Sequence, residues 1–155
     1  MRRKDREISD FSRMIEIVRT CDCCRLGLLD TDEAYIVPMN FGFTAHEGQL
    51  TFYFHGAAEG RKIKLIRNQP RASFEMDRKH KLLRGDTACA FSYRYQSVMG
   101  KGDIRLIESY EEKIRGLQTI MAHYSADSFM AFEEKQMDRV CVIRLDVTHW
   151  SCKAH

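Results

Sequence analysis

The chain contains six or seven short runs with the two-residue alternation of β-strands, and this feature restricts its fold more than any other. Short polar turns join most of the runs; Glu47-Gly48, for example, predicts a hairpin between Ala34–Phe43 and Gln49–His55. A doubly wound α/β fold needs a helix after nearly every strand, so the pattern argues against it. We expect a mainly β (α+β) fold, a small antiparallel barrel with flanking helices.

The expected elements follow from local periodicity and end signals. The predicted strands are Cys24–Leu29, Ala34–Phe43 interrupted by Pro38, Gln49–His55, Arg71–Asp77, Ala88–Val98 with a continuation at Asp103–Ile107 beyond a break or bulge at Gly100-Lys101-Gly102, and Arg139–Thr148. Residues 78–86 are predicted to form a loop or hairpin end. Helices are predicted over Ser9–Thr20, after Gly60 up to Pro70, after the capping box of Ser109 and Glu112, and at Ser128–Gln136.

Composition limits the class of protein. A chain of 155 residues, 44% hydrophobic and with only two prolines, is expected to form a single domain over residues 1–155. A net charge of +3 is too small to indicate a nucleic-acid partner. We find neither an apolar stretch long enough to span a membrane nor a signal-type segment, so we expect a cytoplasmic protein without a membrane partner.

The six cysteines give no clear site. A reducing compartment argues against a disulfide framework. Zinc sites use paired Cys or His spacings, and Cys21, Cys23 and Cys24 have no second pair, so we predict no metal. Most of the cysteines are interpreted as small buried hydrophobes, and the role of the cluster stays open.

Residues 51–62 are the segment most typical of a functional site. An alternating strand runs into a His-Gly turn and then into Gly60, Arg61 and Lys62, which open a short amphipathic helix. The free N–H groups and the dipole at a helix N-terminus favour an anion, and two cations strengthen that preference. From the residues alone, a phosphate site and an ordinary strand-turn-helix carry equal weight.

Two further segments could contact a ligand. Pro38 interrupts a strand, which places residues 38–41 at an edge or bulge where backbone groups of Met39 and Asn40 are free. Gln96 and Ser97 end an apolar strand just before Gly100 and Gly102, which permit close approach. Taken alone, each segment is more simply an edge strand or a bulge.

Four segments together resemble one family. Cys24–Leu28, Tyr35–Gly42, Tyr53–Lys62 and Ser92–Gly102 occur in the order found in FMN-binding split barrels. More narrowly, they are similar to the pyridoxamine 5′-phosphate oxidase-related flavoproteins that include the Nim 5-nitroimidazole-resistance proteins. The resemblance implies a six-stranded antiparallel split β-barrel and a homodimer with two FMN molecules at the subunit interface.

The resemblance also assigns residues to the cofactor. Gly60, Arg61 and Lys62 are expected at the FMN phosphate; Pro38, Met39, Asn40 and Phe41 along the isoalloxazine or ribityl chain; His55, Gly56 and Ala57 beside the flavin; and Gln96, Ser97 and Val98 at the ring of the partner subunit's flavin. Trp150 either closes the pocket or is an aromatic residue of the dimer interface.

The implied activity is a flavin-dependent oxidoreductase that reduces a small planar acceptor. His55 is the one candidate proton donor, and simple packing at the barrel mouth is the alternative. Residues 150–155 contain no Arg of the kind that binds substrate phosphate in the true oxidases, so we do not expect pyridoxamine 5′-phosphate oxidation. The alternatives are a non-catalytic flavin or haem carrier or sensor, a deazaflavin protein, and a nucleic-acid-binding barrel. The acceptor and the electron donor are not determined by the sequence.

Overall fold

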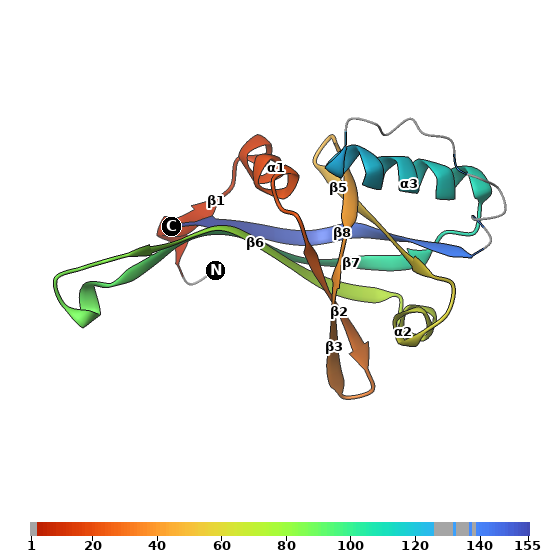
Figure 1. Ribbon diagram of the computed structural model, residues 1–155, viewed down its shortest axis with the longest axis horizontal. Helices are drawn as coiled ribbons and strands as arrows, with labels where there is room; N and C mark the ends of the chain where they lie inside the picture. The colour runs from red at the N-terminus through yellow and green to blue at the C-terminus, as the bar shows by residue number, and fades with distance from the viewer. Residues whose placement is uncertain (1–2, 126–131, 133–136, 138) are drawn as a thin grey trace.

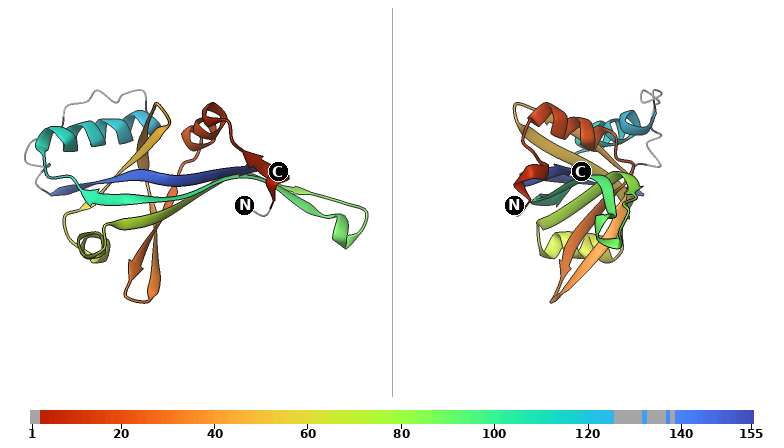
Figure 2. Two further views of the ribbon diagram at one scale, coloured as in Figure 1. Left: turned by 180° about the vertical axis from the view of Figure 1, so that it is seen from behind. Right: turned by 90° about the vertical axis from the view of Figure 1, so that its left-hand side faces the viewer.

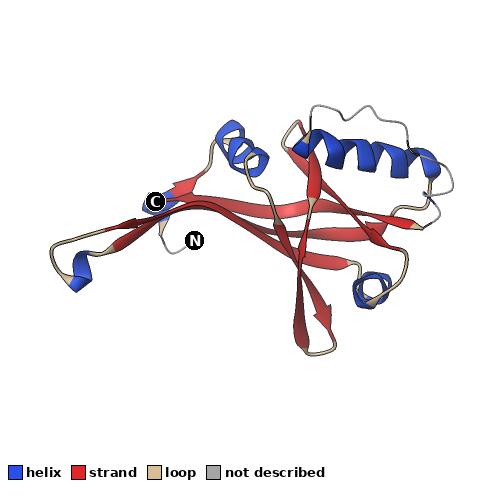
Figure 3. Cartoon of the chain, in the orientation of Figure 1, coloured by secondary structure: helices blue, strands red, loops and turns tan. Residues whose placement is uncertain are grey.

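The computed structural model describes residues 3–125, 132, 137 and 139–155 and is built mainly from strands (Figures 1 and 3). The strands are β1 (Glu7–Ile8), β2 (Cys24–Asp30), β3 (Glu33–Met39), β4 (Phe41–His46), β5 (Gln49–Ala57), β6 (Arg71–Leu83), β7 (Ser92–Leu106) and β8 (Val140–Ala154). The helices are α1 (Phe11–Arg19), α2 (Arg61–Asn68) and α3 (Tyr110–Tyr124), with 3₁₀ turns at Lys4–Arg6 and Ala88–Ala90.

The described strands form one antiparallel sheet that curls into a split barrel. The order is β3-β2-β6-β7-β8-β5-β4, with β1 paired to β8. Its two outermost strands, β3 and β4, follow one another in the chain and are separated only by Asn40. The two outermost strands are therefore joined through the backbone at Asn40, and no hydrogen-bonded ladder connects them. The two views of Figure 2 show the resulting curl, with the β2–β3 hairpin projecting to one side.

The strand alternation builds the core inside this curl. Phe41, Phe52 and Phe54 are fully buried, and Phe52 packs edge-on against Phe41 and Phe74 at ring-centroid distances of 5.6 and 5.0 Å. A second apolar cluster lies under α3, where Leu117 meets the outward-facing Val142. Because burial of apolar surface is the main stabilising term, these two clusters hold the sheet in its curled form.

The helices begin as their end signals predict. The Asp10 carboxylate accepts a 2.8 Å hydrogen bond from the Arg13 N–H, which caps α1. The Ser109 hydroxyl accepts one of 3.4 Å from the Glu112 N–H, which caps α3. The Glu112 side chain does not complete the reciprocal capping box, because its carboxylate is bonded elsewhere.

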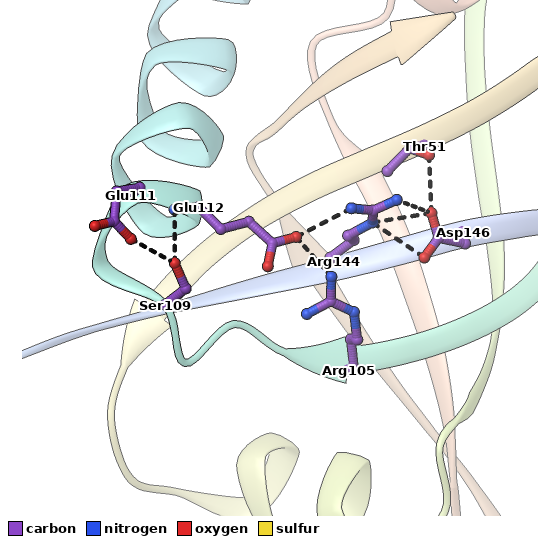
Figure 4. A network of polar contacts seen from close by, with 7 residues as sticks. All are labelled: Thr51, Arg105, Ser109, Glu111, Glu112, Arg144 and Asp146. Carbon is purple, nitrogen blue, oxygen red and sulfur yellow. Dashed lines mark hydrogen bonds and ion pairs between the residues drawn. The ribbon is translucent and has the colours of Figure 1, made fainter.

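A network of charged residues attaches the start of α3 to the barrel (Figure 4). Glu112 accepts hydrogen bonds of 2.6 Å from Arg105 on β7 and 3.0 Å from Arg144 on β8. Arg144 also binds Asp146 at 2.8 Å, and Asp146 in turn accepts a 2.9 Å bond from the Thr51 hydroxyl on β5. Two strands and one helix are thus linked to β5 through a chain of charge-assisted contacts.

The structure confirms the split barrel with flanking helices, and it differs from the sequence prediction in its details. The predicted strand 34–43 is divided at Asn40 into β3 and β4. The predicted loop at residues 78–86 lies largely within β6, whose hairpin with β7 extends as an arm beyond the rest of the molecule (Figure 1). The described residues form eight strands in place of six. The helix predicted at 128–136 lies outside the described residues, apart from Phe132.

The predicted break or bulge at Gly100-Lys101-Gly102 is a bulge: β7 continues through both glycines to Leu106, while its register with β8 shifts between Lys101 and Gly102. A Cβ atom at Gly100 would lie 2.6 Å from the Phe74 ring, and one at Gly102 would overlap the Asp146 carbonyl. These glycines therefore allow neighbouring groups to pack closely against a continuous strand.

Candidate functional site

The helix α2 begins at Arg61, four residues after the end of β5. Gly60 precedes the helix with φ = 127°, a conformation that side chains rarely adopt, and the space where its Cβ would lie is open to 4 Å. No side chain caps the helix at this position. Ile63 and Ile66 are buried against the barrel, which fixes the direction of the helix. The site is thus an open helix N-terminus of the kind that accepts an anion.

Arg61 is held by the tip of the β2–β3 hairpin. Its Nε donates a 2.6 Å hydrogen bond to the Asp30 carboxylate, and its guanidinium carbon lies 4.7 Å from the centre of the Tyr35 ring. Neither Asp30 nor Tyr35 was identified from the sequence as part of the site. Their contact joins segments about thirty residues apart, and no local pattern in the chain indicates it.

Lys62 lies on the other side of the helix start, over β5. A Cβ atom at Gly56 would lie 2.8 Å from both Cε and Nζ of Lys62, so the absence of a side chain at Gly56 makes room for the ammonium group. Lys62 has no ion pair or hydrogen-bonded side-chain partner within the described part of the chain. Its charge reaches Cys141, which pairs with Gly56; burial raises the pKa of that thiol, and Lys62 is among the cations that oppose the rise.

Asn40 and His55 lie near one another, at the junction between β3 and β4. Phe41 pairs with Phe54 and both are buried, so the preceding Asn40 and the following His55 lie beside each other at the end of the ladder, and both are exposed. Pro38 is exposed on β3, whereas Met39 is buried. Side chains alternate along a strand, so the His55 imidazole leaves β5 on the face opposite to Gly56 and the Lys62 ammonium. Ala57 shares the His55 face.

The third group of predicted residues lies elsewhere in the same chain. Gln96, Ser97 and Val98 are on β7, which is separated from β3 by β2 and β6. Val98 is fully buried against Cys152, so its side chain faces the core, and Gln96 shares that face. Trp150 packs edge-on against Phe11 of α1 at 6.0 Å. One chain therefore brings together the residues at 38–41 and 55–62, but not those on β7.

Two features are absent from the described residues. No helix in that part of the chain is long and apolar enough to cross a membrane. No group of three or more His, Cys, Asp or Glu side chains among those residues is arranged to hold a metal ion.

Known proteins resemble this chain in sequence and fold. The family described as pyridoxamine 5′-phosphate oxidase matches residues 11–154. A candidate 5-nitroimidazole antibiotic resistance protein from Bacteroides thetaiotaomicron is 31% identical, with 96% of this chain and 86% of that chain covered and a TM-score of 0.83. No curated protein matches the chain.

Two structures that are less similar to this chain in sequence share its fold. The flavocytochrome Anf3 from Azotobacter vinelandii is 20% identical, with 100% of this chain and 72% of that chain covered and a TM-score of 0.84. The FAD and haem binding protein from Mycobacterium smegmatis is 15% identical, with 96% and 73% covered and a TM-score of 0.80.

Proposed function

The chain belongs to the pyridoxamine 5′-phosphate oxidase family, and from this premise we propose that it is a cytoplasmic FMN-binding oxidoreductase. The acceptor is a small planar molecule of the nitroimidazole type. The 31% identity to a candidate 5-nitroimidazole resistance protein supports this choice of acceptor. The protein acts as a homodimer, with FMN held between its subunits.

The arrangement around the start of α2 supports the cofactor proposal most directly. The space above Gly60 is open, and the next two residues in the chain are the cations Arg61 and Lys62. Of these two cations, Lys62 has no bonded partner among the described residues, and Arg61 is oriented by Asp30 and Tyr35. A terminal phosphate at this position would accept bonds from the helix N–H groups and from both cations. The residues present therefore fit the phosphate end of FMN.

The ring end of the cofactor requires the second subunit. Asn40 lies beside His55, whereas Gln96 pairs with Ala154 on β8, twelve residues along that strand from Val142, the partner of His55. In our proposal the partner's β7 completes the site, which accounts for the separation of the two groups within one chain. When bound, FMN supplies the electron-transfer chemistry. The protein binds and orients the cofactor, excludes water from it and, through the His55 imidazole, holds a proton for the acceptor.

Replacing both cations tests the cofactor proposal. In Arg61→Ala/Lys62→Ala, loss of the charge-assisted contacts should cost about 3–6 kcal/mol of FMN binding before non-additivity, or roughly two to four orders of magnitude in affinity. The measurement is a titration with FMN followed by flavin absorbance and fluorescence. The matched control is Lys64→Ala/Arg67→Ala, which removes two exposed cations from the same helix. A double variant that binds within a few-fold of wild type would refute the phosphate assignment.

Replacing His55 tests the proposed proton donor and separates an enzyme from a carrier. His55→Ala should bind FMN normally and should transfer electrons more slowly, by about 10²-fold or more, from dithionite-reduced flavin to a nitroimidazole under anaerobic conditions. His46→Ala, at the exposed β4–β5 turn, is the control. Unchanged rates would remove His55 from the mechanism. If the wild-type protein binds FMN but its reduced flavin transfers no electrons, a carrier or sensor is the better description.

A further inference from the structure

A row of polar side chains extends the core face of the sheet at the base of the β6–β7 arm. Met76 pairs with Val98, Val98 with Cys152 and Cys152 with Ile8, and all four side chains are buried. Two residues further along the same strands, Arg78 pairs with Gln96 and Gln96 with Ala154. Side chains two residues apart share a face, so these side chains continue the surface that the apolar row begins. Arg6 immediately precedes β1, at the outer end of this row.

Both arginines in this row have a buried Nε donor without a hydrogen bond, although the Asp5 carboxylate lies 4.0 Å from the Nε of Arg6. Among the described residues, every other buried side-chain nitrogen or oxygen atom forms a hydrogen bond, and the Nε atoms of Arg78 and Arg6 do not. Burying a donor without an acceptor is unfavourable, and such groups are rare in folded proteins. Their occurrence in one row indicates that an acceptor is missing there.

A cavity of about 170 Å³ lies between this row and α1. Its polar lining consists of Arg13, Glu16, Thr20, Arg78, Lys79 and Gln96. Three of these side chains are cations and one is a carboxylate, and none of the four makes an ion pair with another described residue. The cavity is several times larger than the roughly 30 Å³ that one water molecule occupies. It therefore has both the size and the excess of donors that suit a small anion.

The backbone departs from regular strand geometry at this place. The β6–β7 register shifts between Arg78 and Lys81, and Lys79 has φ = 56°. A bulge re-aims the side chains of the strand that carries it, and a lysine at positive φ is a strained residue. Strain of this kind gathers at binding sites, where the surrounding structure holds it in place. Here it coincides with Arg78 and Lys79, two of the three cations that border the cavity.

We propose that this cavity is a binding site for a small oxyanion, a carboxylate or phosphate group, with Arg78 as its central ligand. The planar guanidinium offers Nε–H and Nη–H donors to two oxygens of one anion. Gln96 adds an amide donor, and Arg13 and Lys79 supply further positive charge. The site lies under α1 and uses none of the residues around the start of α2. Among the residues assigned to the flavin it includes only Gln96, and it does not rest on the proposed function.

The test measures binding of inorganic phosphate and of acetate, each at constant pH and ionic strength. It uses the Arg61→Ala/Lys62→Ala protein, so that the anion cannot respond to the proposed flavin-phosphate site. Binding is followed by NMR through the arginine Nε–H resonances, with the Arg78 signal identified by its loss in Arg78→Lys. We expect one or both anions to shift this resonance saturably. The anion that binds more tightly identifies whether the natural group is a phosphate or a carboxylate.

Two variants and a control complete the experiment, with affinity measured by calorimetry. Arg78→Gln should abolish saturable binding, and Arg78→Lys, which keeps the charge but lacks Nε, should weaken it by about tenfold or more. Arg94→Gln makes the same change of charge at an exposed position on the same hairpin and should bind normally. If Arg78→Gln does not fold, the lysine variant gives the answer. No saturable binding of either anion, or equal binding by the Arg78 variants, would overturn the proposal.

Discussion

At the scale of single residues, Gly56 determines where the Lys62 ammonium can lie. The side chain that a larger residue would carry there points into the space that Cε and Nζ of Lys62 occupy. The family resemblance placed Gly56 beside the flavin. The structure shows that it first allows close approach of a cation from the next helix. The same lysine could not have been placed from sequence, because its position depends on how α2 packs on β5.

We predict that Gly56→Ala weakens FMN binding without unfolding the protein. The added Cβ would lie 2.8 Å from the end of the Lys62 side chain, which is flexible and must move aside. Loss of one well-placed cation should lower FMN affinity by about tenfold, while the free energy of unfolding changes by less than about 1 kcal/mol. Ala122→Ser, which adds one atom at an exposed position on α3, is the control. Equal FMN affinities for the two variants would contradict this role of Gly56.

At the scale of elements, the start of α3 shows how a local signal can be correct while its details change. Ser109 and Glu112 predicted the helix start, and Ser109 does cap it. The Glu112 carboxylate, however, turns to Arg105 and Arg144 on the barrel strands, where charged partners are stronger than the N-cap backbone N–H. These arginines lower the pKa of Glu112, mainly through the hydrogen bond from Arg105.

The lowered pKa predicts a pH-dependent stability that Glu112→Gln should remove. A carboxyl group whose pKa is lower in the folded state stabilises the fold above its unfolded pKa, near 4.3, and this contribution is lost as the pH falls through the folded value. The variant should therefore be less stable than wild type by about 1–2 kcal/mol at pH 7 and should approach it below about pH 4. Urea unfolding at several pH values measures this, with the exposed Glu108→Gln as control. A stability difference that does not change with pH would argue against the ionic origin.

At the scale of the whole molecule, the outer face of the sheet bears exposed apolar side chains. Ile36 on β3 is 64% exposed, Leu29 on β2 52% and Met99 on β7 54%. Ile36 pairs with Gly27, and Gly27 pairs with Ser73. The neighbouring residues on this face therefore have small side chains, which leave the apolar side chains uncovered. Exposed apolar groups gathered on a sheet face are typical of association surfaces. This face is our candidate for the subunit interface of the proposed homodimer.

Replacing Ile36 tests the dimer and its link to the cofactor together. Ile36→Arg should shift the protein toward monomer, because a charge would have to be buried in an apolar interface. Its FMN affinity should fall as well, since each site is proposed to need the partner's β7. Light scattering after size-exclusion chromatography gives the mass, and flavin absorbance in the same peak gives occupancy. Tyr110→Arg, at an exposed position on α3, is the control. A dimeric Ile36→Arg protein with full FMN occupancy would exclude this interface.

The sequence by itself determined the elements and the family of this protein. These follow from local properties of the chain, which can be recognised without knowledge of the fold. They are the strand alternation, the caps of α1 and α3, and the ordered motifs around Pro38, Gly60 and Ser97. Only the tertiary structure decided that Arg61 binds Asp30, that His55 leaves β5 on the face opposite to Gly56 and Lys62, and that Arg78 lies beside Gln96 with an unpaired donor. These features depend on strand register, bulges and helix packing. They are set by contacts between distant segments, which no local pattern specifies.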